Sequence, residues 1–277
     1  MRLGNLEVFA VQDSRFWLDG GAMFGVVPKP LWRRLTKPDR KNRIYLGANC
    51  FVVLYKDAAL VVDTGWGDEW SQKERQIYRL EGGGLLRKRL ADAGVAEDDV
   101  RFVANTHLHI DHAGGNCTNG APAFRKARYL LQTAEVDAAQ NPSPLSAGSY
   151  REGDWRPLID AGVLELLPSD AEPLPHCRLI KTGGHTKGHQ VLLVETPDAT
   201  VLFPGDLIPT RHHLNLPYIM GYDLYPEELV ERKRQFLEQA VKDGWLLLFE
   251  HDVEPCFCRV GKRGRRFYAK EVAEATR

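Results

Sequence analysis

The chain has 277 residues, of which 43% are hydrophobic and 27% are charged, and this length allows one substantial core. Its 37 Lys and Arg residues balance its 37 Asp and Glu residues, so the formal net charge is zero. Because proteins that bind polyanions usually carry a basic surplus, this balance excludes nucleic acid as the expected partner.

The N-terminus and the cysteines indicate a compartment. Residues 1–7 lack the apolar stretch of a signal peptide, and no apolar run reaches the roughly 18 residues that a membrane helix needs. The five cysteines are odd in number and scattered, which is typical of free thiols in a reducing compartment. We therefore expect a cytoplasmic protein without a membrane partner. Cys256 and Cys258 are separated by one residue, unlike a usual zinc-binding pair.

The first part of the chain contains few regular patterns. Residues 1–45 are punctuated by Gly and Pro, which predicts a loop-rich segment, and their apolar side chains indicate that it packs over the site. Residues 50–55 and 59–62 are short apolar runs separated by Lys56 and Asp57, which predicts a β-hairpin. Residues 68–92 are predicted to be helical, with a break at their run of glycines.

The remaining elements predict an α/β fold in one domain that spans residues 1–277. Strands are predicted over residues 100–104, 129–132, 163–167, 178–181, 190–195, 200–203 and 246–249, and helices over residues 134–139 and 227–243. Many short strands with interspersed helices indicate two sheets sandwiched between helices. A basic cluster near the C-terminus is expected to be a solvated tail or an edge strand: Lys262, Arg263, Arg265, Arg266 and Lys270.

The segment THLHIDHAGGN, residues 106–116, follows a predicted strand and carries four side chains that can bind metal: His107, His109, Asp111 and His112. Residues 107, 109 and 111 alternate along the chain and His112 points away from them. One segment can therefore bind two ions from two sides. Gly114 and Gly115 would let another backbone approach closely beneath the site. The alternative is a polar turn with chance histidines, but the chain has only nine histidines and three of them fall within these residues.

Three further metal-binding side chains share one structural context. His185, Asp206 and His251 each follow a predicted strand, where loops from different strands can converge. Any one of them alone could cap an element or form a structural hydrogen bond. Together with the HxHxDH segment, they predict a metal site.

This set of residues resembles, in order and type, the pattern of the metallo-β-lactamase superfamily, in which HxHxDH is followed by distant His, Asp and His residues. The sequence Asp63-Thr64-Gly65 is a further hallmark of that family. The resemblance implies a four-layer α/β/β/α sandwich. It also implies one ion on His107, His109 and His185, a second on Asp111, His112 and His251, and Asp206 as a bridge between them. His189 has no place in that scheme and is expected to be structural.

The predicted chemistry is hydrolysis. Two divalent ions about 3.5–4 Å apart hold a bridging water, lower its pKa toward neutrality and so supply a hydroxide for attack. Asp111 and Asp206 would be the catalytic carboxylates that orient this nucleophile and handle its proton. Zinc is the first expectation, while Fe, Mn or Co suit the same ligands. The histidine at position 109 argues against the di-iron redox members of the family, which have Glu there.

The expected substrate is a small molecule. Residues 19–29 are similar to the N-terminal segment of quorum-quenching acyl-homoserine lactonases, which implies that Met23 and Phe24 contact an acyl chain. The alternative is that these two side chains anchor the loop to the core, or that apolar residues of this segment form a homodimer surface.

One position departs from the lactonases. They have a Tyr three residues after the bridging Asp, and this chain has Pro209 there, so His212, His213 or Tyr222 is expected to take its place. Phosphotriesterase, phosphodiesterase or thioesterase activity remains the alternative within the hydrolases. A non-hydrolytic redox protein is the alternative outside them.

Overall fold

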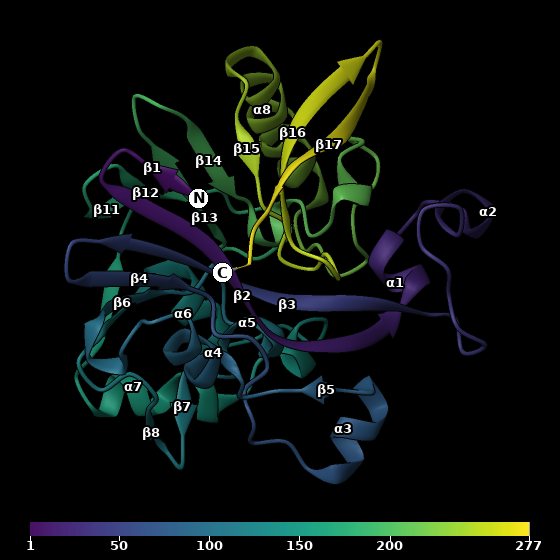
Figure 1. Ribbon diagram of the computed structural model, residues 1–277. Helices are drawn as coiled ribbons and strands as arrows, with labels where there is room; N and C mark the ends of the chain where they lie inside the picture. Colours follow the sequence, from purple (N-terminus) through teal and green to yellow (C-terminus); the bar gives the residue numbers. More distant parts are fainter. Residues whose placement is uncertain (277) are drawn as a thin grey trace.

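The fold consists of two β-sheets packed face to face, and the computed structural model describes residues 1–276 (Figure 1). Among these residues the first sheet has the order β1 (Arg2–Leu3), β2 (Leu6–Asp19), β3 (Arg43–Tyr55), β4 (Ala58–Val62), β6 (Val100–Ala104), β9 (Arg128–Gln132) and β10 (Leu164–Leu167), with β5 (Glu81–Gly82) paired to β2. The second has the order β11 (Ala171–Leu174), β12 (Cys177–Lys181), β13 (Gln190–Glu195), β14 (Thr200–Phe203), β15 (Leu246–Leu247), β16 (Cys256–Arg263) and β17 (Arg266–Glu274). A short hairpin joins β7 (Cys117–Thr118) to β8 (Ala121–Pro122).

Helices cover the outer faces of both sheets. The first sheet is covered by α4 (Leu86–Asp92), α6 (Thr133–Gln140) and α7 (Arg156–Asp160), and the second by α8 (Pro226–Asp243) (Figure 1). Short helices occur in loops: α1 (Gly20–Phe24), α2 (Lys29–Trp32), α3 (Gln72–Tyr78) and α5 (Ile110–Ala113).

Separate buried clusters account for this layering. One cluster lies between the sheets and contains Phe51 from the first and Phe203 from the second, whose rings stack with centroids 5.5 Å apart. Another joins Leu90 of α4 to the first sheet, and a third joins Leu237 of α8 to the second. The order is thus helix, sheet, sheet, helix, and the expected four-layer α/β/β/α sandwich is confirmed.

The expectation of a loop-rich segment over residues 1–45 is wrong for its first part. β2 is a strand of 14 residues that pairs with β3 from Leu6 opposite Tyr55 to Asp19 opposite Arg43. Three polar residues in mid-strand, Gln12, Asp13 and Ser14, interrupt its apolar pattern although all are buried, and the pairing has a bulge there.

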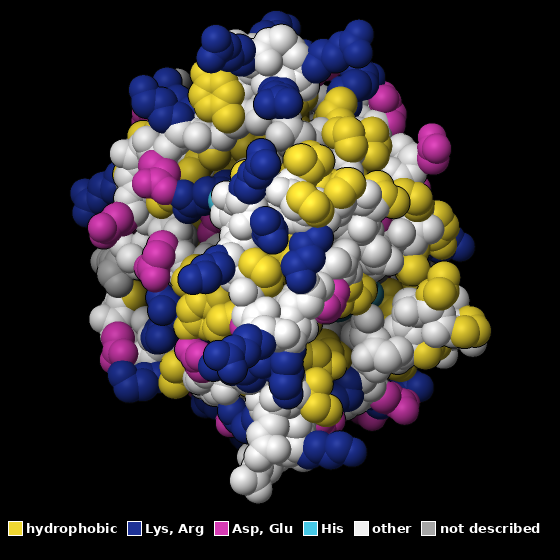
Figure 2. All heavy atoms as spheres, turned by 90° about the vertical axis from the view of Figure 1, so that its right-hand side faces the viewer, with side chains coloured by type: hydrophobic (Ala, Val, Ile, Leu, Met, Phe, Trp, Pro, Cys, Tyr) yellow, Lys and Arg dark blue, Asp and Glu magenta, His cyan; other side chains and the backbone are white. Residues whose placement is uncertain are grey.

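The irregular part of this segment is residues 20–42, which carry α1 and α2 at one side of the sandwich (Figure 1). Figure 2 shows the molecule from that side, where apolar and basic side chains are intermixed. The exposed apolar side chains of this loop include Val26, Leu31 and Leu35. A homodimer surface here stays a prediction.

The other expected elements occur within a few residues of their predicted limits. The hairpin of β3 and β4 turns at Lys56 and Asp57, and the helical stretch after residue 68 is broken into α3 and α4 around β5. The basic cluster near the C-terminus lies on the hairpin of β16 and β17, and β17 is an edge strand. Among residues 1–276, no helix combines the length and apolar content needed to cross a membrane.

Candidate metal centre

The HxHxDH segment begins in the loop after β6, which carries His107 and His109, and continues into α5, which carries Asp111 and His112. It meets three loops of the second sheet at one end of the sandwich. His185 lies beyond the end of β12, Asp206 lies in a short 3-10 helix after β14, and His251 lies beyond the end of β15. Gly114 allows a close backbone approach beneath the loop, because a Cβ there would lie 2.2 Å from the carbonyl oxygen of Trp66.

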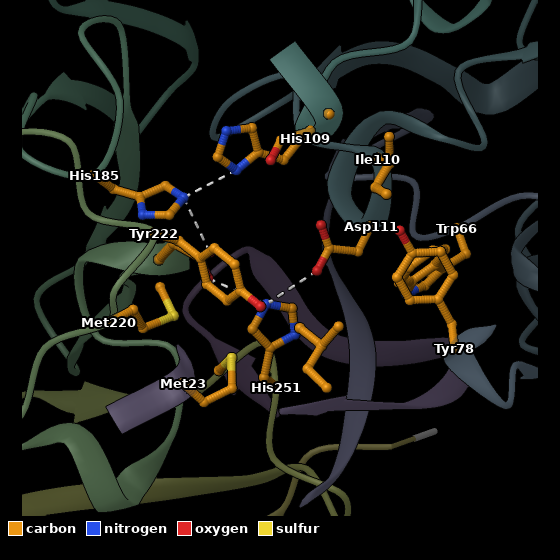
Figure 3. A pocket seen from close by; sticks show the side chains of 14 residues that line it. Met23, Trp66, Tyr78, His109, Ile110, Asp111, His185, Met220, Tyr222 and His251 are labelled. Carbon is orange, nitrogen blue, oxygen red and sulfur yellow. Dashed lines mark hydrogen bonds and ion pairs between the residues drawn. The ribbon is translucent and has the colours of Figure 1, made fainter. Parts of the chain in front are cut away.

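Asp206 is at the middle of the cluster. Its Oδ2 lies 3.2 Å from His185 Nε2 and 3.6 Å from His112 Nε2, and its Oδ1 lies 3.1 Å from His251 Nε2. His107 Nε2 is 3.9 Å from the same carboxylate. All seven predicted ligands are therefore brought together around one point (Figure 3 labels His109, Asp111, His185 and His251).

The cluster divides into groups that could each hold an ion. Within each group the ligand atoms lie within 4.8 Å of one another, and the groups are His107–His109–His185, His107–His112–Asp206, Asp111–His112–His251 and Asp63–His112–Glu250. The first and third are the two triads expected from the sequence. Asp206 lies between them, 3.2 Å from His185 Nε2 of the first triad and 3.1 Å from His251 Nε2 of the other.

The buried donor atoms fit a divalent cation. Among the described residues, the Nε2 atoms of His107, His109 and His112 are buried and have no hydrogen-bond partner. Buried polar atoms are nearly always hydrogen-bonded, so the orphaned Nε2 atoms of His107 and His112, which lie 3.9 Å and 3.6 Å from Asp206 Oδ2, indicate an electron-pair acceptor. His109 instead presents Nδ1 to the cluster, 3.1 Å from His185 Nε2. Imidazole and carboxylate together suit zinc and related divalent transition metals.

The outward-facing nitrogens of the imidazoles have oxygen partners, which fixes the rings. His185 Nδ1 lies 2.7 Å from Asp223 Oδ1, and His251 Nδ1 lies 2.9 Å from the carbonyl oxygen of Gly47. His112 Nδ1 lies 2.9 Å from Glu250 Oε1. With Nδ1 donating to oxygen, the Nε2 lone pair of each ring is directed at the centre, as in carboxylate–histidine–metal arrangements.

Two of these supporting residues escaped the sequence reasoning. Asp223 lies in a loop without a motif, and nothing in its sequence neighbourhood signals its contact with His185. Glu250 directly precedes His251, so a carboxylate beside a predicted ligand was the available signal. Asp63, the family hallmark, accepts hydrogen bonds from the backbone nitrogen and the hydroxyl of Thr106, both at 2.7 Å.

The predicted ligands differ in protonation state. Burial lowers the pKa of His107 and of His109 well below the usual value, and neighbouring imidazoles lower it further, so both rings are neutral. Although burial alone raises the pKa of Asp206, the imidazoles of His112 and His251 hold it well below its usual range. The centre therefore combines an ionised carboxylate with two neutral imidazoles, those of His107 and His109. Although burial lowers the pKa of His112, His185 and His251, the facing carboxylates raise it above the usual value, so a metal ion bound there would displace their protons.

His189 supports the carboxylate from behind. Its Nε2 accepts a hydrogen bond from the backbone nitrogen of Asp206 at 3.1 Å, and its Nδ1 lies 2.7 Å from the hydroxyl of Thr182. Because the backbone N–H can only donate, His189 is neutral with its proton on Nδ1. It therefore positions Asp206 by a backbone contact.

A cavity of about 100 Å³ opens onto the cluster (Figure 3). Its inner end is formed by His109, Asp111, His185, Asp206 and His251. Its walls are mainly apolar and aromatic, with Met23, Met220 and Tyr222 on one side of the view and Trp66 and Tyr78 on the other. No Lys or Arg among the described residues lines it.

Three of the five substrate-contact candidates lie elsewhere. Met23 and Tyr222 line the cavity, whereas Phe24 is fully buried between the rings of Trp32 and His213. The aromatic stack draws Phe24 into the core, so it anchors its loop, which was the alternative left open by the sequence. His213 lies in the same stack, and His212 lines a second cavity on the far side of His251.

The chain is similar to known hydrolases over most of its length. The family model described as metallo-beta-lactamase superfamily matches residues 44–251. An N-acyl homoserine lactonase of Bacillus cereus is 26% identical over 227 residues, which cover 77% of this chain and 84% of that protein.

Solved structures share the fold. A probable metal-dependent hydrolase from Staphylococcus aureus superposes with a TM-score of 0.89 at 26% identity, covering 98% of this chain and 99% of that one. AidC, a dizinc quorum-quenching lactonase, superposes with a TM-score of 0.83 at 19% identity, covering 99% and 96%. Since the family model spans most of the sequence, the chain belongs to the metallo-beta-lactamase superfamily and is one of its metal-dependent hydrolases.

Proposed function

We propose that this protein is a two-metal lactonase that opens acyl-homoserine lactones or related lactones. The observation that carries the proposal is the cavity, which has ionisable ligands at its inner end and apolar walls without a cationic side chain among the described residues. A neutral, partly apolar ester fits such walls, whereas phosphodiesters and glutathione carry charges that would be left unpaired there. The relationship to an N-acyl homoserine lactonase at 26% identity supports the same substrate class.

In this proposal two divalent ions, with zinc as the first candidate and Fe, Mn or Co as alternatives, occupy the two triads. His107, His109 and His185 would hold one ion and Asp111, His112 and His251 the other, with Asp206 between the two triads. When bound there, such ions lower the pKa of water toward neutrality and polarise a carbonyl oxygen.

The carboxylates supply the proton chemistry. Asp111 is the most accessible ligand candidate, with a side chain 14% exposed, and it lines the cavity. It can therefore accept the proton of the attacking water and return it to the alcohol that leaves when the ring opens. Asp206 orients the same water, and His189 holds its backbone at 3.1 Å.

Tyr222 supplies a hydroxyl donor for the substrate carbonyl, in place of the residue that Pro209 replaces. It lines the same cavity as Asp111 and lies across from it in Figure 3. Burial raises the pKa of Tyr222 to about 12, so the hydroxyl keeps its proton at neutral pH and can donate to an oxygen that gains charge. Met23 and Met220 line the same cavity and would pack along an acyl chain.

The test is acid release from a panel of substrates by the metal-replete protein. The panel contains acyl-homoserine lactones of two chain lengths, a simple γ-lactone, an aryl phosphotriester and a glutathione thioester. We expect lactone opening to dominate and to fall by about 100-fold or more in His109→Ala, because that variant loses a ligand of one ion. His212→Ala, an imidazole outside the cavity, is the matched control and should keep activity.

Each other outcome has a distinct meaning. Turnover of the phosphotriester or thioester without turnover of any lactone would contradict the proposed substrate class but remain consistent with the metal mechanism. Unchanged lactone turnover in His109→Ala, with circular dichroism confirming the fold of both variants, would overturn the two-metal mechanism.

A further inference from the structure

Glu135 is a fully buried carboxylate in the first turn of α6, and it accepts hydrogen bonds from separate segments of the chain. Its Oε1 accepts from the backbone nitrogen of Leu108 at 3.0 Å and from the hydroxyl of Tyr150 at 3.2 Å. Its Oε2 accepts from the hydroxyl of Thr186 at 2.6 Å and from the backbone nitrogen of Gly188 at 3.2 Å. Donors on both oxygens fix the plane of this carboxylate.

The donors adjoin the ligands of one triad. Leu108 stands between two of the histidines in the chain and Thr186 follows the third, the three being His107, His109 and His185. The ring of Tyr150 packs on that of His109 with centroids 5.1 Å apart, and the backbones of the two residues form a β-bridge. One carboxylate therefore connects the two loops from which this triad is built.

Gly188 brings the second loop into backbone contact with α6. A Cβ on this residue would lie 2.2 Å from the backbone nitrogen of Glu135, which no side chain tolerates. The loop that carries His185 and the first turn of α6 are thus packed without an intervening side chain. A change in the Glu135 carboxylate is transmitted to this loop directly.

The other triad is supported by different groups. His112 Nδ1 faces Glu250 at 2.9 Å and Asp63 at 3.2 Å, and His251 Nδ1 faces the carbonyl of Gly47 at 2.9 Å. Within residues 1–276, none of these contacts involves Glu135. Thr106 Oγ1 is shared, since it lies 3.0 Å from His107 Nδ1 and 3.3 Å from His112 Nδ1, whereas the hydrogen bonds that Glu135 accepts adjoin the first triad alone.

We propose that Glu135 is a positioning residue for the ion that His107, His109 and His185 would hold. It acts by fixing the two ligand loops relative to each other, and the inference rests on the proposed two-metal function. Glu135→Gln should weaken that ion selectively. The amide has one acceptor oxygen and one NH2 group, so one pair of native donors then faces another donor.

The test is zinc retention against a series of chelator concentrations, followed by metal analysis of the protein. We expect the wild-type chain to hold two ions and Glu135→Gln to lose one of them at about tenfold less chelator or lower, the range typical of groups that support metal ligands. Asp137→Asn makes the same chemical change at an exposed position of the same helix and should match the wild type.

Single-triad backgrounds identify the ion. With His251→Ala, which leaves the first triad intact, Glu135→Gln should weaken the remaining ion by the same factor. With His109→Ala, which leaves the second triad intact, it should have no effect. Equal weakening in both backgrounds, or unchanged retention in Glu135→Gln alone, would overturn the inference.

Failure of the proposed two-metal function is distinguishable from failure of this inference, because the former appears as fewer than two ions bound to the wild-type protein. If Glu135→Gln does not fold, Tyr150→Phe and Thr186→Val each remove one donor and keep the carboxylate. Both should then weaken the ion of the first triad by a smaller factor. Unchanged retention in both variants would count against Glu135.

Discussion

The imidazole of His213 is stacked on the ring of Phe24, with centroids 4.6 Å apart and planes 13° from parallel. On its other face Phe24 stacks on Trp32, with centroids 5.4 Å apart and planes 3° from parallel. His213 Nε2 donates to the carbonyl oxygen of Met23 at 2.8 Å, and Nδ1 lies 2.7 Å from the hydroxyl of Thr210. The stack thus fixes the backbone of Met23 where its side chain meets the cavity.

Phe24→Ala should therefore loosen one wall of the cavity. Because Phe24 is fully buried, the substitution should lower the free energy of unfolding by about 3–5 kcal/mol and raise KM for long acyl chains. Denaturant unfolding of the variant and the wild type measures the first effect. Val26→Ala in the same loop removes a side chain that is 81% exposed and should change stability little. If Phe24→Ala lowered the free energy of unfolding as little as Val26→Ala, the anchoring role of Phe24 would be contradicted.

Acid should destabilise the protein through His213. Burial lowers the pKa of His213 from 6.5 to about 3, so between these values the unfolded chain binds more protons than the folded one. This contribution to stability is fully present above pH 6.5 and is lost as the pH falls toward 3. By pH 5 the loss in the free energy of unfolding amounts to about 2 kcal/mol.

The measurement is the unfolding free energy at pH 7 and pH 5 for the wild type and His213→Gln. The glutamine keeps a donor for Met23 but does not titrate. The variant should therefore lose about 2 kcal/mol less unfolding free energy between pH 7 and pH 5 than the wild type. Comparing the two proteins cancels the other acid-sensitive groups, such as His212, whose pKa burial lowers to about 4. Equal losses would exclude His213 as the cause.

Tyr222→Phe should reduce kcat for lactone opening by about 10- to 100-fold with KM changed little, because the hydroxyl would act on charge that develops after binding. Steady-state kinetics on one acyl-homoserine lactone measures both constants. Tyr225→Phe removes a hydroxyl from a nearby tyrosine that is 42% exposed and outside the cavity lining, and it should leave both constants unchanged. An equal kcat in Tyr222→Phe and Tyr225→Phe would show that the Tyr222 hydroxyl does not contribute to the reaction.

Much of the fold could be predicted from short apolar runs, because strands buried on both faces, such as β13 and β14, are nearly continuous in Val and Leu. β2 could not, because its middle looks like a turn. There Gln12 donates to Asn49 at 3.0 Å, and Asp13 accepts from the backbone nitrogen of Leu85 at 2.8 Å. Polar side chains satisfied by distant segments give no periodic signal in one sequence.

The site likewise contains residues that could be predicted from the sequence and residues that could not. The candidate ligands were predictable because metal binding demands particular residue types at close spacing, as in the segment from His107 to His112. Asp223 and Glu250 each support one histidine over a long range, and Glu135 accepts hydrogen bonds from four residues of distant segments. A single acidic residue carries no motif that would signal such contacts. Phe24 failed as a substrate contact because burial decides its role, and burial in a Gly-rich loop depends on tertiary packing.

The two sheets contribute separate donors to the metal centre. The loop from His107 to His112 leaves the first sheet, and His185, Asp206 and His251 follow strands of the second. Ions held between them would tie the halves of the sandwich together, so their binding free energy would add to the free energy of unfolding. Metal starvation would then shorten the lifetime of the folded chain against proteases as well as silence the enzyme.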